Sequence, residues 1–262
     1  MKKGSRTKNR GIALLIVLLV TALLIALIFE FSYATRISLN SAVNFRDSQR
    51  AYFLARAGVY ASIKYRDTLI KKIPQDEWQP VPFIGEEDTQ VLIKWQDEQG
   101  KFNINTINSN PGHDWIEKLF SDQGVEMSVY DKVAEMRKDR SFNLIAELHA
   151  AMSDEDYQKV IRFLSVFSDN TINFNTAPAE VFIAMGCNEN SARAIVELRK
   201  RELLDTEKLK PYLPPSLATT VSSNNLPSTI AKFTVYSHAT VGGYTKEIVA
   251  IIGSDQPYWR AL

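Results

Sequence analysis

The first quarter of the chain carries two hydrophobic patterns in succession. From Ile12 to Phe29 the sequence is apolar except for Thr21, and it holds no charged residue. As a helix rising about 1.5 Å per residue, this run spans about 27 Å, close to the hydrocarbon thickness of a bilayer. The pattern then becomes amphipathic, with apolar residues at mostly three- and four-residue steps: Phe45, Tyr52, Ala55, Val59, Ile63, Ile70 and Ile73. Because no proline occurs before Pro74, the sequence predicts one helix of about sixty residues.

Strand-like patterns follow in two places. Apolar or alternating runs predict strands at residues 81–84, 89–95 and 102–104, and again at 231–241 and 244–253. The last two flank Gly242-Gly243, which is typical of a β-hairpin turn. The sheet-forming part is therefore expected in two pieces, separated by a long insertion.

The insertion, residues 111–217, has the periodicity of short amphipathic helices. The helical pieces are HDWIEKLF, YDKVAEMRK, SFNLIAELHAAM, SDEDYQKVIRFL, APAEVFIAM and NSARAIVELRKR. Ser153 and Asp156 resemble a capping box, with aspartate in place of the usual glutamate, and Pro178 suits a first helical turn.

Two segments, KFNINTINS and TINFNTAPAE, share an apolar-Asn-apolar-Asn-Thr pattern. Asparagine side chains can close local turns, and threonine can cap the helix that follows. A role as ligand contacts is the alternative, but turn and cap chemistry is what these residue types usually perform. We therefore interpret six residues as turn or cap positions: Asn103, Asn105, Thr106, Asn173, Asn175 and Thr176.

Composition argues against several function classes. Lys and Arg number 31 against 30 Asp and Glu, so no global field points to nucleic acid. The single cysteine, Cys187, rules out an intramolecular disulfide framework, and we expect it to be a small buried hydrophobe. G-x-S-x-G, H-E-x-x-H and Walker A motifs are absent, so the sequence favours a scaffold over an enzyme.

The N-terminal segment has three interpretations. Five basic residues and no acid precede the apolar run, which predicts a cytoplasmic N-terminus and export of everything after residue 30. A cleaved signal peptide could end at Ser32-Tyr33-Ala34, although the apolar run is long for one. The others are an uncleaved anchor and a prepilin leader ending in Gly11, where a glycine gives a peptidase access to the backbone.

Pieces in order along the chain resemble the K-type minor pseudopilins of bacterial type II secretion (the GspK family). They are RGIALLIVLLV, RAYFLARAGV, DEQGKFNINT, FNLIAEL, INFNTAPAEV and FTVYSHATVGGYTKEIVAIIG, from residue 10 to 253. The set is specific, although no single piece is. The resemblance implies an α+β, pilin-like fold: a long N-terminal helix packed on an antiparallel sheet, with a large all-α insertion like a SAM or helix-hairpin-helix domain.

The resemblance also implies how the chain is divided and processed. It predicts a prepilin leader (residues 1–11), a transmembrane half of the helix (12–30), its exported amphipathic half (31–74), two parts of the sheet (75–110 and 218–262) and the helical insertion (111–217). Prepilin peptidase would cut after Gly11, and Ile12 would be N-methylated.

For function, the resemblance implies a protein of the inner membrane with a periplasmic globular part. Such proteins sit at the pseudopilus tip with the I- and J-type minor pseudopilins, and no nucleic acid is expected. Some members bind calcium. The acidic residues that could do so here are Glu86, Glu87, Asp88, Asp97 and Glu98, although a solvated turn is the simpler interpretation.

Ile16 departs from the pattern of most pilins, which carry glutamate at the fifth mature position. That carboxylate neutralises the N-terminal amine of a neighbouring subunit in an apolar setting, where an unpaired charge costs several kcal/mol. The first carboxylate after Gly11 is Glu30, about 20 Å further along the helix. We therefore hypothesise that no subunit lies above this one, while a membrane protein that never polymerises is the alternative.

A second resemblance leaves another function open. INFNTAPAEVFIAMGCNENSARAIVELRKR is similar to the helix-hairpin-helix of competence DNA receptors, whose glycine-rich turn and basic residues reach phosphates. Here the turn retains one glycine, Gly186, and Glu189 has the wrong charge. Arg193, Arg199, Lys200 and Arg201 supply positive charge, which Glu197 and Glu202 dilute. Salt-dependent binding of short duplex DNA would favour this alternative, a DNA-uptake pseudopilin.

Overall fold

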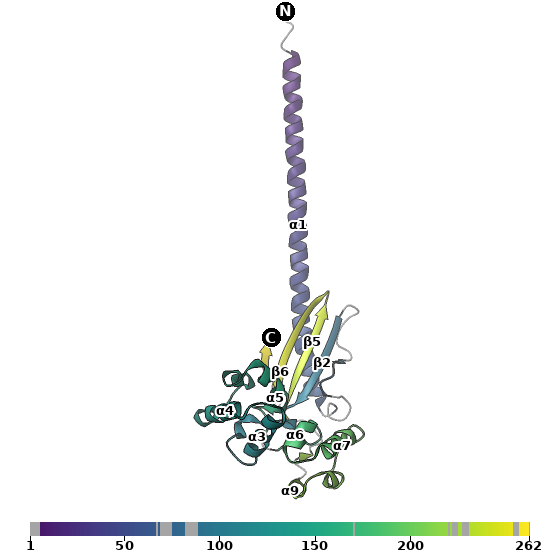
Figure 1. The fold of residues 1–262 in the computed structure, drawn as a ribbon. Helices are drawn as coiled ribbons and strands as arrows, with labels where there is room; N and C mark the ends of the chain where they lie inside the picture. The colour runs from purple at the N-terminus through teal and green to yellow at the C-terminus, as the bar shows by residue number, and fades with distance from the viewer. Residues whose placement is uncertain are drawn as a thin grey trace, which may run out of the picture.

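The computed structural model describes residues 6–66, 68, 75–81, 89–169, 171–219, 221, 225–226, 231–253 and 257–261. Its dominant element is the helix α1 (Arg6–Lys64), whose N-terminal half extends away from the rest of the molecule (Figure 1). At 59 residues it confirms the predicted single helix. Ile70 and Ile73, placed in the same helix by the sequence pattern, lie outside the described residues.

A five-stranded antiparallel sheet packs against the C-terminal end of α1. Its order is β1 (Gln79–Pro80), β2 (Thr89–Asp97), β5 (Phe233–Val241), β6 (Tyr244–Ile252) and β7 (Pro257–Ala261). The predicted hairpin is present, with Val241 paired to Tyr244 and positive φ angles of 54° at Gly242 and 83° at Gly243. In the strand predicted at 81–84, Val81 lies outside any strand and the remaining residues are not among those described.

The sheet and α1 share one hydrophobic core. Every second residue of the central strands faces the helix. Trp95, Val235 and Ala250 are neighbours across three strands and pack against the small side chains of Ala55 and Val59. Successive strand residues point to opposite faces, so the same strands present Lys94 and Tyr236 on the other face. Small residues on α1 allow its backbone to approach the sheet closely.

The closest approach is at Gly58, and it carries a prediction. A Cβ atom there would lie 2.2 Å from Ser237 Oγ and 3.1 Å from Val91 Cγ1. Gly58→Leu is therefore expected to lower the free energy of unfolding by about 3 kcal/mol, because the sheet must move to admit the side chain.

Thermal unfolding of the full chain in detergent, followed by near-ultraviolet circular dichroism, measures this effect. Gln49→Leu is the matched control, since Gln49 is exposed on α1 and the change should cost no more than about 0.5 kcal/mol. Equal melting of the two variants would show that Gly58 does not set the spacing between helix and sheet.

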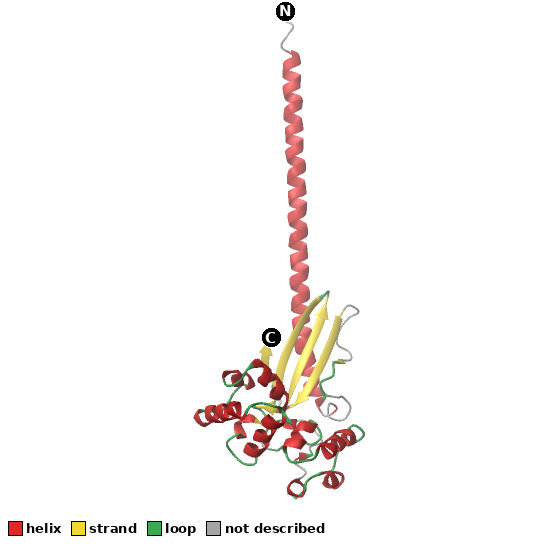
Figure 2. Ribbon diagram, viewed as in Figure 1, coloured by secondary structure: helices red, strands yellow, loops and turns green. Residues whose placement is uncertain are grey.

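The helical unit lies at the end of the molecule farthest from the N-terminus of α1 (Figure 2). It contains α3 (Gly112–Asp122), α4 (Met127–Asp139), α5 (Asp154–Val160), α6 (Ala179–Ala184), α7 (Glu189–Arg199), α8 (Thr206–Leu209) and α9 (Pro215–Ala218), with a parallel pair of short strands, β3 (Phe102–Asn103) and β4 (Leu164–Ser165). Its core is a second cluster, separate from that of the sheet and rich in phenylalanine, including Phe120, Phe163, Phe174 and Phe182.

Local details differ from the sequence pattern in three places. Residues 141–152 form only a 3₁₀ segment, Ile145–Ala150, in which the Glu147 carboxylate accepts the backbone N–H of Leu144 and closes a tight turn. Ile104, expected in a strand, begins a 3₁₀ turn (Ile104–Thr106). Pro178 precedes α6 instead of occupying its first turn.

Two other local expectations are confirmed. Ser153 Oγ accepts the backbone N–H of Asp156 at 3.1 Å, so Ser153 caps α5. Cys187 is buried, and burial raises the pKa of its thiol to about 11, which suits a core side chain and not a nucleophile.

Candidate functional site: apolar anchor and acidic junction

The N-terminal half of α1 is an exposed apolar rod. Its most apolar window of 18 residues has a mean hydropathy of 3.4, and none of that window is buried against the rest of the chain. Ile16 is 56% exposed and Phe29 is 72% exposed. Since each Å² of apolar surface left in water costs about 25 cal/mol, this segment favours an apolar environment, and it is long enough to cross a bilayer.

Polar groups within this rod are satisfied or absent. Thr21 Oγ1 donates to the carbonyl oxygens of Val17 and Leu18 at 3.0 Å, so its hydroxyl needs no water. At Gly11 a Cβ atom would meet nothing within 4 Å, which leaves the backbone at the predicted cleavage point open. Ile12 and Ile16 lie in the same uninterrupted helix.

Beyond the apolar run, α1 has two unlike faces. Ala51, Ala55 and Val59 are buried against the sheet. The opposite side exposes aromatic rings, including Phe45, Tyr60 and Phe53, which is 59% exposed. Large exposed apolar side chains in a row are typical of an interaction surface.

The end of β2 carries two buried carboxylates, which correct the interpretation of this stretch as a solvated turn. Asp97 is only 1% exposed and Glu98 only 5%. Asp97 Oδ2 accepts hydrogen bonds from Asn173 Nδ2 at 2.6 Å and Thr176 Oγ1 at 2.7 Å, and its Oδ1 accepts the backbone N–H of Gln99 at 2.9 Å. We call this group of contacts the acidic junction, because it joins the sheet to the helical unit.

Glu98 extends the acidic junction to a second strand. Its Oε1 accepts from Thr234 Oγ1 at 2.6 Å and from Lys101 Nζ at 3.0 Å, and its Oε2 accepts from Ser165 Oγ at 2.5 Å. The charge of Glu98 is thus paired with that of Lys101. The sequence does not reveal either carboxylate as a junction residue, because the partners that join it to other parts of the fold, Asn173, Thr176, Ser165 and Thr234, lie 67 to 136 positions away.

The repeated Asn-Thr motif supplies part of this junction. Asn103 Oδ1 accepts the N–H of Asn105 at 2.9 Å, and Asn173 Oδ1 accepts that of Asn175 at 3.0 Å, which closes a turn in each copy. Thr106 and Thr176 do not cap helices, contrary to the sequence-based expectation. Their hydroxyls turn back to the carbonyl oxygens of the asparagines three residues earlier, at 2.7 and 3.2 Å.

The second asparagine of each copy ties the turn to a distant segment. Asn105 Oδ1 accepts the N–H of Phe142 at 2.8 Å, and its Nδ2 donates to the carbonyl of the same residue at 3.0 Å. Asn175 Oδ1 accepts the N–H of Leu204 at 2.9 Å. The motif therefore organises the helical unit from within.

Burial determines the protonation of Asp97. Loss of hydration raises the pKa of this carboxyl to about 6, although its three hydrogen bonds act in the opposite direction. A carboxyl with this pKa gains a proton more readily than an exposed one.

The acidic junction does not fit a calcium site. Calcium needs six to eight oxygen ligands, whereas the oxygens of Asp97 and Glu98 are held by N–H and O–H donors. Across the described residues no group of three or more His, Cys, Asp or Glu side chains is placed to hold a metal. Glu86, Glu87 and Asp88, the other predicted ligands, lie outside those residues.

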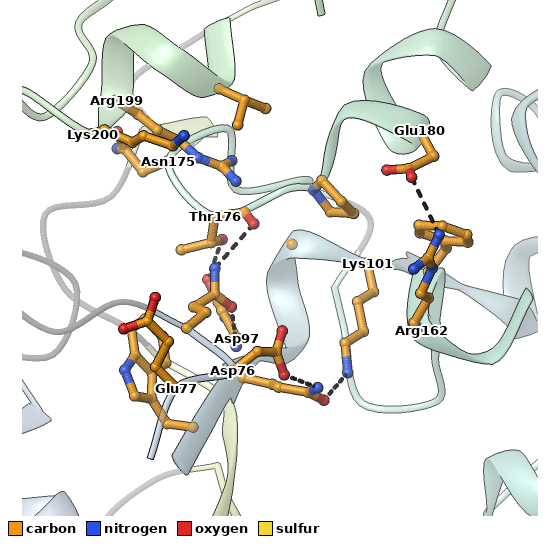
Figure 3. Close-up of a pocket in the computed structure, with 17 residues that line it drawn as sticks. Asp76, Glu77, Asp97, Lys101, Arg162, Asn175, Thr176, Glu180, Arg199 and Lys200 are labelled. Carbon is orange, nitrogen blue, oxygen red and sulfur yellow. Dashed lines mark hydrogen bonds and ion pairs between the residues drawn. The ribbon is translucent and has the colours of Figure 1, made fainter. Parts of the chain in front are cut away.

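A cavity of about 610 Å³ opens beside the junction. Figure 3 shows its labelled side chains, with Arg199 and Lys200 on one side, Asp76 and Glu77 on another, and the ion pair of Arg162 with Glu180 on a third. Charges of both signs therefore border one space.

A helical hairpin is present as α6 and α7, and three of its four predicted basic residues are engaged, while Arg201 is exposed just after α7. Gly186 has a φ of 102° and ends α6. Arg193 pairs with Glu189, and Lys200 pairs with Glu197 at 2.6 Å. Arg199 donates to the carbonyl oxygens of Phe174 and Ala177, so it faces the chain's own backbone.

Comparison with known proteins identifies the fold. No family model and no curated protein sequence matches the chain. A solved structure does: a chain of the GspK-GspI-GspJ complex from the type 2 secretion system of enterotoxigenic Escherichia coli. The match has a TM-score of 0.58 and 14% sequence identity, and covers 84% of this chain and 97% of that one. The chain therefore has a pseudopilin-like fold, with a long N-terminal helix packed on an antiparallel sheet.

Proposed function

We propose that this protein is a minor pseudopilin of a type II secretion system and acts as a scaffold, not as an enzyme. The proposal rests on one observation. Within a pseudopilin-like fold, α1 has an N-terminal apolar half that is not buried against the rest of the chain and a C-terminal half that packs on the sheet. A single helix of this kind suits a protein of the inner membrane, with a cytoplasmic N-terminus and a periplasmic globular part.

Within such an assembly we propose a place at the tip of the pseudopilus. Ile16 offers no carboxylate to the amine of a subunit above it, and Glu30 lies about 20 Å too far along the helix. The helical unit, which lies at the far end of the molecule from the anchor, would add a bulky cap (Figure 1). The chain would thus start the pseudopilus, which serves to export folded proteins across the outer membrane.

The proposed partners are minor pseudopilins of the I and J types. The matched structure is a complex that includes GspI and GspJ. The exposed aromatic face of α1 offers this chain a surface for packing against the helices of such partners. Aromatic rings of this kind are enriched among the residues that dominate binding energy.

Co-purification tests this proposal. Expressed with the I- and J-type proteins of its own secretion system, the detergent-solubilised chain is expected to elute as a ternary complex. Phe53→Glu should weaken the complex at least about tenfold, since it places a charge in a desolvated interface.

Thr245→Glu is the matched control, because Thr245 is exposed on β6 and is not part of the aromatic face of α1. A wild-type chain that elutes alone, or equal behaviour of the two variants, would contradict the proposed partnership.

DNA binding is not favoured as a second function. Phosphate contacts need cations that are free to leave their partners. In the hairpin Arg193 and Lys200 are held by glutamates, and Arg199 is half-buried beside the cavity, so these three side chains do not form an exposed basic surface for a phosphate backbone.

A further inference from the structure

The cavity beside the acidic junction has the properties of a binding site. Its volume of about 610 Å³ lies within the range of about 300–1,000 Å³ that is typical of ligand sites. It is formed where the sheet meets the helical unit, by side chains from residues 75–77, 95–101, 162–163, 175–180 and 196–200. The half-exposed side chains of Pro178 and Val196 add apolar surface between the charged groups.

The buried acceptor in the cavity wall is already occupied. Both oxygens of the Asp97 carboxylate accept hydrogen bonds, from Gln99, Asn173 and Thr176. The other carboxylates, those of Asp76, Glu77 and Glu180, belong to exposed or half-exposed side chains, where water hydrates them. The buried part of the cavity wall therefore has no carboxylate oxygen waiting for a donor among the described residues.

Donors, in contrast, remain available on the α7 side. Arg199 is half-buried and uses one nitrogen, Nη1, to reach the carbonyl oxygens of Phe174 and Ala177. Among the ion pairs of the described residues, none joins Arg199 to a carboxylate. Burial lowers the pKa of this guanidinium to about 10, which reflects the cost of an uncompensated charge.

Asn175 provides a second donor in the same wall. The two carbonyl groups bonded by Arg199 belong to residues on either side of Asn175, and Figure 3 shows both side chains at the cavity. The Nδ2 atom of Asn175 is buried and has no hydrogen-bond partner. A buried donor without a partner destabilises the folded chain, so an acceptor that reaches this nitrogen would restore a missing hydrogen bond.

We propose that this cavity binds a peptide segment of another protein, with an acidic side chain of the peptide received by Arg199 and Asn175. A carboxylate matches the planar fork of a guanidinium and can form two parallel hydrogen bonds with it. Charges of both signs around the rim, together with the half-exposed apolar side chains of Pro178 and Val196, match a peptide better than a small free anion. This proposal does not depend on a role in secretion.

Two peptide pools provide the test. The full chain is immobilised in detergent and offered seven-residue peptides with either glutamate or glutamine fixed at the centre and all other positions randomised. The glutamate pool is expected to be retained at least about tenfold more, since charge-assisted hydrogen bonds contribute about 1.5–3 kcal/mol. Equal retention of the pools, or retention of neither, would overturn the proposal.

Three variants locate the binding. Arg199→Lys should lower retention of the glutamate pool about tenfold, because the ammonium cannot make the bidentate contact. Asn175→Asp should abolish retention and raise the melting temperature, because the new carboxylate of the chain itself would pair with the Arg199 guanidinium in place of the peptide. Arg193→Lys is the matched control, since Arg193 lies on α7 outside the cavity, and it should change retention less than twofold.

Two further results would contradict the proposal. Unchanged retention by both site variants would place the peptide elsewhere. Release of the bound pool by free glutarate at the concentration of the peptides themselves would identify a site for small dicarboxylates.

Discussion

Replacing Asp97 with alanine is expected to lower the free energy of unfolding by about 4 kcal/mol. The carboxylate accepts three hydrogen bonds, and its loss leaves the Asn173 amide and the Gln99 N–H without an acceptor, while Thr176 retains only the carbonyl of Asn173 at 3.2 Å. Because the junction joins β2 to the helical unit, the loss should also loosen the attachment between the two parts. Denaturant unfolding of the full chain in detergent, followed by tryptophan fluorescence, measures the effect.

Asp122→Ala is the matched control. Asp122 is exposed on α3 and pairs with Lys118 of the same helix at 2.8 Å, and exposed ion pairs contribute about 0–1 kcal/mol. If the two alanine variants unfold alike, the acidic junction does not hold the sheet to the helical unit.

The same carboxyl group gives the stability a defined pH dependence. Its pKa is about 6 in the folded chain against an ordinary value of 3.8, so the folded state binds the proton more tightly. The contribution is therefore full below about pH 4 and is lost as the pH rises through 6. The difference of about two pKa units corresponds to about 3 kcal/mol.

Asp97→Asn removes this titration while keeping the side chain's shape. Between pH 4 and pH 7.5 the wild-type free energy of unfolding should fall relative to that of the asparagine variant. Parallel curves for the two proteins would show that Asp97 does not titrate in this range.

The sequence was sufficient to predict the elements that depend on local pattern. The apolar run before Phe29 and the amphipathic spacing after it predict α1, because a helix repeats every 3.6 residues and needs no distant partner. The hairpin at Gly242-Gly243 was equally local, since two positive φ angles require residues such as glycine.

The acidic junction could not be predicted in this way. Asp97 and Glu98 stand in the polar stretch DEQG, which by itself is typical of a solvated turn. The partners of Asp97 are 76 and 79 positions away, at Asn173 and Thr176. Thr234, bonded to Glu98, is 136 positions away. Only the packing of the helical unit against the sheet brings these groups together.

The cavity, too, is formed only when the helical unit packs against the sheet. Arg199 looked like one of several basic residues on a helix, and its burial follows from the folding of residues 174–177 beneath it. Composition carries no signal for such a contact. A useful indication would have been the conflict between a charged residue and its position on the apolar side of α7, where Ala192 and Ile195 are buried.

Cleavage at Gly11 is the prediction with the largest expected effect on the proposed function. Incubated with prepilin peptidase in detergent, the full chain is expected to lose residues 1–11 and yield a product that begins at Ile12, as measured by intact mass. Gly11→Val should slow the cleavage at least about 100-fold, because a β-branched side chain obstructs access to the backbone.

This experiment separates processing from folding. A Cβ atom at Gly11 meets nothing within 4 Å, so the valine variant keeps α1 intact and a loss of cleavage cannot be attributed to misfolding. Gly4→Val is the matched control and should be cleaved at the wild-type rate. An uncleaved wild-type chain would indicate a simple membrane anchor, and a product that begins at Thr35 would indicate a cleaved signal peptide. Either result would contradict the proposed pseudopilin, because the peptidase must leave the apolar half of α1 in place as the anchor.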